Sequence, residues 1–192
     1  MSFKLTHFDP NVWIREREGG YDHIGTHTDD VLLVDVDPSS IFEKLKETYT
    51  IKSFGPPVVH LGCNYARDKK GDETLWVMAS YTYITECLTK VCALLKVATL
   101  RKDKLPCSPG DHPELDSNPL LDEAQHHLYQ QLISVAEWAV QIGRFDIRYA
   151  VTSLKRFSVT PREGHLLVKI FGYLQKVSAK RKSIVVSPED IS

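Results

Sequence analysis

The chain of 192 residues contains no apolar run approaching the ~20 residues that a bilayer-spanning helix requires. Its first residues also lack the hydrophobic core of a signal peptide. Four cysteines occur without C-x-x-C spacing, which argues against a zinc site and against a disulfide framework. We therefore expect no membrane association and an intracellular location, either cytoplasmic or nuclear.

A strong excess of either charge is missing as well, but only on average. The formal net charge is −1 at pH 7, and hydrophobic and charged residues make up 42% and 26% of the chain. These values are ordinary for one or two small globular domains. Positions 111–141 hold acidic side chains and no Lys or Arg, whereas positions 142–192 are rich in both. The basic last third favours a polyanionic partner, although a solvated surface gives the same pattern.

The hydrophobic pattern changes at Ser80 and predicts an α+β fold. Short runs rich in strand-forming residues, separated by turn signals, dominate residues 11–79. One helix interrupts them after Asp37-Pro38, an N-cap with proline at the first helical position. We expect a small antiparallel sheet with one helix over residues 1–79, then a bundle of three or four helices over residues 80–178. The remaining 179–192 would be a flexible tail.

Helical periodicity marks the second region. Apolar residues from Ile84 to Leu95 share one stripe, and a linker with four prolines follows over 105–119. Further stripes run over 129–140 and 145–157. Thr160-Pro161-Arg162-Glu163 is a capping box that predicts the start of a last helix.

The most informative stretch is His27-Thr28-Asp29-Asp30, which lies between two strand-forming runs. The pattern predicts a β-hairpin with Asp29 and Asp30 at its tip. Two adjacent carboxylates can share a hard divalent cation such as Mg²⁺. A turn preference of aspartate explains the same dipeptide without any metal.

Several further segments occur in a specific order. Together with the Asp-Asp hairpin, they make the chain resemble, from about Phe8 to Val177, the reverse transcriptase of copia-type retrotransposons. The segments are Phe8-Asp9-Pro10-Asn11-Val12-Trp13, Ile51 to Gly55, His60-Leu61-Gly62, Tyr129 to Ile133, Arg144 to Ile147, Arg156-Phe157, Pro161-Arg162-Glu163 and Gly172-Tyr173-Leu174. His27 departs from the aromatic residue that the family places before x-Asp-Asp.

The resemblance implies the second half of a polymerase palm over 1–79 and a thumb-like region over 80–178. Asp29 and Asp30 would then be catalytic and would bind Mg²⁺ or Mn²⁺. A primer-grip-like segment would include Phe54, Gly55, Leu61 and Gly62. An RNA or DNA primer–template would be the partner, as would a polypeptide that supplies the missing half of the polymerase.

The resemblance also shows what this sequence does not supply. The strand that carries the family's first catalytic aspartate, the fingers and the RNase H domain have no counterpart here. We therefore expect the chain to be inactive alone, because two-metal catalysis requires a further carboxylate. A non-catalytic module of the same ancestry, binding nucleic acid or a protein, is the alternative.

A basic face is predicted on the helix near residue 150. Arg144, Arg148 and Lys155 are offset by 4 and 11 residues and would lie on one side of it. Arg162 and Lys169 would add to this face from the next helix. Such a surface suits phosphate contacts, and a solvated helix face is the alternative interpretation.

Four weaker patterns point elsewhere. Asp35-Val36-Asp37 matches the D-x-D signature of many glycosyltransferases, but Asp37 is better explained as a helix cap. Adjacent His126 and His127 point about 100° apart on a helix and do not share a metal. His165 could contact a phosphate, and Lys180-Arg-Lys182 is shorter than an ordinary nuclear localisation patch.

Overall fold

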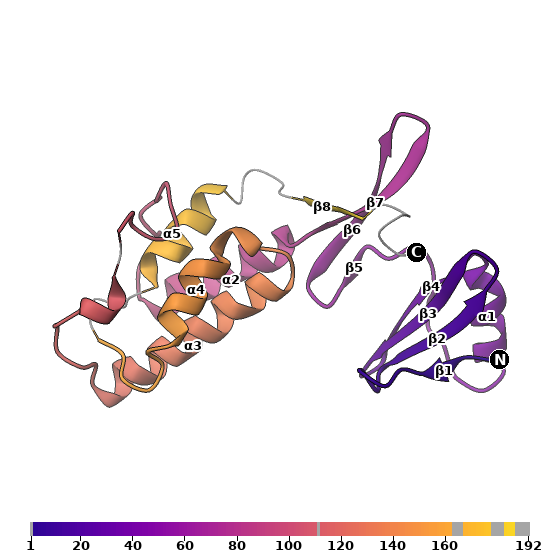
Figure 1. Cartoon of the computed structure of the whole chain (residues 1–192), viewed down its shortest axis with the longest axis horizontal. Helices are drawn as coiled ribbons and strands as arrows, with labels where there is room; N and C mark the ends of the chain where they lie inside the picture. The colour runs from indigo at the N-terminus through magenta and orange to yellow at the C-terminus, as the bar shows by residue number, and fades with distance from the viewer. Residues whose placement is uncertain (1, 111, 163–166, 178–182, 187–192) are drawn as a thin grey trace. The chain divides into compact units, whose positions relative to one another are not determined.

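The computed structural model describes residues 2–110, 112–162, 167–177 and 183–186, and these form an α+β structure, as predicted. They contain two small four-stranded antiparallel sheets and five α-helices (Figure 1). The single sheet expected from the sequence is therefore two sheets. The chain divides into two compact units, residues 1–60 with 65–77 and 185–192, and residues 61–64 with 78–184.

The first sheet has the strand order β1 (Lys4–Leu5), β2 (Val12–Arg17), β3 (Gly20–His27) and β4 (Asp30–Val34). Glu18-Gly19 forms the turn between β2 and β3, where Gly19 has a φ of 80° that glycine adopts without strain. Helix α1 (Pro38–Lys46) follows β4. The Asp37 side chain accepts a hydrogen bond from the Ser40 backbone N–H, so the predicted N-cap is confirmed.

The centre of this sheet carries charge. Trp13, Ile24 and Leu33 lie opposite one another across β2, β3 and β4, but none of them is fully buried. The Asp22 side chain is almost completely buried and accepts hydrogen bonds from the guanidinium groups of Arg15 and Arg17. The sheet is therefore held by an ion-pair network as well as by apolar contact.

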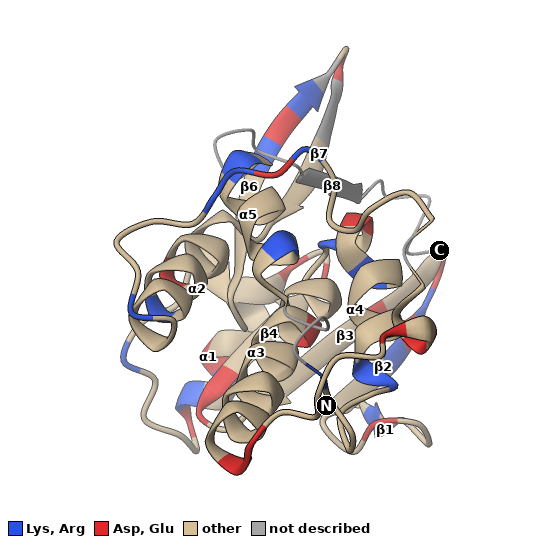
Figure 2. Cartoon of the chain, turned by 90° about the vertical axis from the view of Figure 1, so that its left-hand side faces the viewer, with Lys and Arg blue, Asp and Glu red and all other residues tan. Residues whose placement is uncertain are grey.

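The second sheet has the order β5 (Val59–His60), β6 (Cys63–Lys70), β7 (Glu73–Ala79) and β8 (Ser183–Val186). Strand β6 continues through the charged residues as far as Lys70, and only Gly71-Asp72 form the turn. Strands β6 and β7 form a hairpin, and a hairpin can expose charged side chains to solvent. Figure 2 shows Lys and Arg along this hairpin. Strand β8 also lies within the segment predicted as a flexible tail.

The helical unit contains α2 (Tyr81–Leu94), α3 (Glu123–Gln141), α4 (Arg148–Lys155) and α5 (Val168–Val177), with short 3₁₀ turns at Pro113–Leu115 and Phe145–Ile147. Its core is apolar and buried. It includes Ile84, Cys87, Val91, Tyr129, Leu132, Ala136, Ile147, Val151, Leu167, Ile170, Phe171 and Leu174. Asp122 caps α3 through a capping box with Gln125. Such a core gives this unit its own source of stability.

One expectation about the helices changes. The helix predicted over 145–157 is a 3₁₀ turn followed by α4, and Arg144 bonds Asp146 at the start of the 3₁₀ turn. The capping-box residue Glu163 and the candidate phosphate contact His165 lie outside the described residues. The basic run Lys180-Arg-Lys182 lies outside them too.

Candidate functional site

Asp29 and Asp30 lie at the tip of the β3–β4 hairpin. His27 pairs with Asp30, so Thr28 and Asp29 are the two turn residues. Thr28 has a φ of 54°, an unusual conformation for a β-branched residue. Both carboxylates are exposed, and within the described part of the chain neither has a hydrogen bond or ion pair. The hairpin thus presents two uncommitted carboxylates to solvent.

Two other acids near this sheet, Asp22 and Asp35, are committed to other contacts. Asp35 accepts a hydrogen bond from Arg15 at 2.8 Å and another from the backbone N–H of Asp37 at 2.7 Å. Asp22 is enclosed by two arginines. Among the described residues, no group of three or more His, Cys, Asp or Glu side chains could hold a metal ion. The D-x-D pattern is therefore accounted for by structure, since Asp35 binds Arg15 and Asp37 caps α1.

The basic face on α4 is smaller than predicted. Arg148 and Lys155 are exposed on the same side of the helix, seven residues apart, and Lys155 forms an ion pair with Glu137. Arg144 does not belong to this face: it precedes the helix and is only 4% exposed. Its guanidinium donates two hydrogen bonds to Asp146, at 2.9 and 2.8 Å. Burial and pairing leave Arg144 unsuited to a phosphate contact.

Arg162 and Lys169 are also engaged within the protein. Arg162 donates to the backbone carbonyl of Asn118, and Lys169 donates to the hydroxyl of Ser108. Both partners lie in the long proline-containing segment between α2 and α3. These two side chains therefore fasten that segment, and the structure does not bring them together with Arg148 into one open basic surface.

The four primer-grip-like residues lie in two turns, and each turn is described within its own unit. Phe54 stacks on Phe42 of α1 with 5.1 Å between ring centres, and the Lys46 ammonium lies 4.3 Å from its ring centre. Open space surrounds Gly55. Leu61 and Gly62 form the turn before β6 with φ values of 51° and 80°. Gly62 is thus required by backbone conformation, and Phe54 has a packing role.

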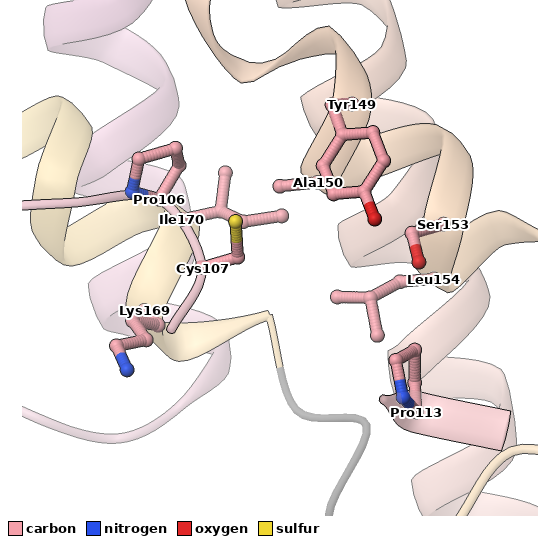
Figure 3. Close-up of a pocket in the computed structure, with 9 residues that line it drawn as sticks. All are labelled: Pro106, Cys107, Pro113, Tyr149, Ala150, Ser153, Leu154, Lys169 and Ile170. Carbon is pink, nitrogen blue, oxygen red and sulfur yellow. The ribbon is translucent and has the colours of Figure 1, made fainter. Parts of the chain in front are cut away.

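A cavity of about 50 Å³ lies in the helical unit, lined by Cys107, Tyr149, Ser153, Lys169 and five other residues (Figure 3). This volume admits one or a few water molecules and is far too small for a nucleotide.

Burial raises the pKa of the Cys87 thiol to about 12. A thiol that stays protonated at neutral pH is a poor nucleophile, so Cys87 has a packing role.

Two groups of residues were missed by sequence reasoning. One is the Arg15–Asp22–Arg17 network, which alternation along paired strands could have suggested once the register was known. The other is Arg67 on β6, whose guanidinium lies 4.9 Å from the ring centre of Trp76 on β7.

No helix of the described chain is both long and apolar enough to cross a membrane.

Comparison with known proteins gives one informative similarity. The chain is 26% identical over 164 residues to a protein named as a transposon Ty5-1 protein, from Saccharomyces cerevisiae. The match covers 81% of this chain and 48% of that relative, so the chain spans about half the relative's length. The similarity supports a retroelement origin. No protein-family model matches the chain, and no solved structure matches it.

Proposed function

We propose that the chain is a piece of the RNA-directed DNA polymerase, or reverse transcriptase, of a copia-type retroelement. It would comprise the second half of the palm and a thumb-like helical region. The observation that carries this proposal is the exposed Asp29-Asp30 pair at a hairpin tip, in a chain similar to a transposon protein. Nucleotidyl transfer uses such carboxylates to hold divalent metal ions.

The available donors fit a weakly held ion only. Asp29 and Asp30 offer oxygen ligands of the kind that Mg²⁺ and Mn²⁺ prefer, and with so few protein ligands the ion keeps most of its waters. The described residues contribute no third acidic ligand to complete the set. The chain alone therefore does not synthesise DNA, and a partner polypeptide carrying the other half of the polymerase supplies the missing carboxylate.

Primer extension tests the proposal. A DNA primer on an RNA template is incubated with Mg²⁺ or Mn²⁺ and the chain alone, the separately expressed preceding half of a related transposon polymerase alone, or both together. Only the mixture should extend the primer. Asp29→Ala and Asp30→Ala should each abolish that extension, whereas Asp9→Ala, an exposed aspartate in the same unit, should not. Extension that survives both hairpin variants would refute the catalytic assignment.

A second candidate function is a non-catalytic retroelement-derived module that binds nucleic acid. The exposed Arg148 and Lys155 on α4 favour it. Phosphate contacts release counterions, so log affinity for duplex should fall with log salt at about −0.9 per contact. Arg148→Glu should weaken binding to all sequences and flatten this slope, while Lys44→Glu on α1 serves as the charge-matched control. Equal effects of the two variants would indicate only a general charge effect, and a protein partner would then be the better proposal.

A further inference from the structure

The β6–β7 hairpin presents a sheet face with unusual composition. The strands are joined by the two-residue turn Gly71-Asp72, so Lys70 lies opposite Glu73 and, three residues further from the turn, Arg67 lies opposite Trp76. The guanidinium of Arg67 stacked over the ring of Trp76 agrees with this pairing. Because side chains alternate along a strand, Tyr65, Arg67 and Lys69 share one face with Trp76.

The two faces of the hairpin differ in exposure and charge. Leu75 is 5% exposed and lies on the opposite face, which is therefore the packed one. Asp68 belongs to that opposite face too. Arg67 and Lys69 are exposed, and Tyr65 and Trp76 are half-buried. The first face thus combines two cations with two aromatic rings and carries no acidic residue between them.

We propose that this face binds single-stranded nucleic acid, with an unpaired base stacked on the Arg67–Trp76 pair and phosphates contacted by Lys69. A guanidinium group held over an indole ring gives a base a preorganised surface for stacking and still offers N–H donors at its edge. Aromatic rings interleaved with basic residues are the usual means of binding single strands without sequence preference. This site is distinct from the α4 face and does not depend on polymerase activity.

Base pairing determines which nucleic acid the face accepts. Bases within a duplex expose only their edges, so they cannot stack on a side chain without being unpaired. The hairpin should therefore prefer a single strand to a duplex of the same length. The α4 face, by contrast, would act through phosphate contacts and should bind duplex as well as single strands.

Fluorescence anisotropy on the full chain tests the inference, using fluorescein-labelled oligothymidylate and an oligo(dT)·oligo(dA) duplex of the same length. Arg67→Gln and Trp76→Leu should each weaken single-strand binding about tenfold, and Trp76→Phe should restore most of it because a ring remains. Arg101→Gln, an exposed arginine in the helical unit, removes the same charge and should change binding less than about threefold. Thermal melts confirm that each variant is folded.

The outcomes separate this inference from the proposed function. If Arg67→Gln and Trp76→Leu bind oligothymidylate as tightly as the parent, the hairpin face has no role in strand binding and the inference fails. If they lose duplex binding in equal proportion, the face does not distinguish a single strand from a duplex and the stacking proposal fails. If primer extension in the mixture fails while single-strand binding shows the expected losses, the polymerase proposal is refuted and the hairpin site stands.

Discussion

The β1–β4 sheet and the helical unit are stabilised in different ways. In the sheet, the side chain enclosed most completely is the carboxylate of Asp22, and Trp13 at the sheet centre is 38% exposed. In the helical unit, Phe171 and Leu167 are fully buried among other apolar side chains. Apolar burial contributes most of the free energy of folding, so the helical unit should be the more stable of the two.

The largest expected effect is in the helical core. Phe171→Ala should destabilise the chain by about 3–5 kcal/mol, because it leaves a cavity that the surrounding buried side chains cannot fill. Phe145→Ala removes the same side chain from a position that is 58% exposed, and it should cost far less. Urea unfolding followed by circular dichroism measures both. Comparable losses in the two variants would mean that the helical unit lacks a tightly packed core.

In the β1–β4 sheet, the position at which substitution should reduce stability most is the charged residue Asp22. Asp22→Asn keeps the shape but turns an amide N–H₂ toward arginine donors, and it should cost roughly 2–3 kcal/mol. Asp30→Asn, on an exposed and unpaired carboxylate of the same sheet, should leave stability unchanged. Hydrogen exchange of β2 and β3 amides measures the local effect. A neutral Asp22→Asn would mean that apolar contacts alone hold this sheet together.

Two glycines allow a tightly packed position on α5 to be compared with an open position on β3. A Cβ on Gly172 of α5 would lie 2.2 Å from the backbone oxygen of Arg101, whereas a Cβ on Gly25 of β3 would meet nothing within 4 Å. Gly172→Ala should therefore destabilise by about 1–3 kcal/mol, since the segment packed on α5 must move. Gly25→Ala should be close to neutral. Thermal denaturation of the two variants checks the difference, and a neutral Gly172→Ala would show that residues 99–103 are not packed tightly on α5.

Local signals explain what could be predicted from the sequence. The cap at Asp37 and the turn around Asp29 depend on residues within a few positions, so pattern reasoning located both. Arg144 was placed on the basic face because its spacing fits, whereas its side chain is buried and paired with Asp146. Helical periodicity records which positions are apolar but not which cations are paired.

Contacts between distant residues explain most of the remainder. The hydrogen bonds of Arg162 to Asn118 and of Lys169 to Ser108 join positions 44 and 61 residues apart. No sequence pattern distinguishes a lysine that fastens a loop from one that awaits a phosphate, since both follow the same periodicity. The contact between Arg67 and Trp76 depends on the exact register of the β6–β7 hairpin.

The smallest expected effect concerns the hairpin tip itself. Asp29 and Asp30 repel each other and have no cationic partner among the described residues, so Mn²⁺ should bind weakly and relieve that repulsion. Paramagnetic broadening of amide signals near residues 27–31 should show this binding, and Asp29→Ala should reduce it without changing the unfolding midpoint. Asp9→Ala provides the control, because that carboxylate accepts a backbone hydrogen bond from Asn11. Broadening that persists in Asp29→Ala and Asp30→Ala would place the ion elsewhere. Loss of the broadening in these two variants would show that the hairpin tip supplies metal ligands without a partner polypeptide.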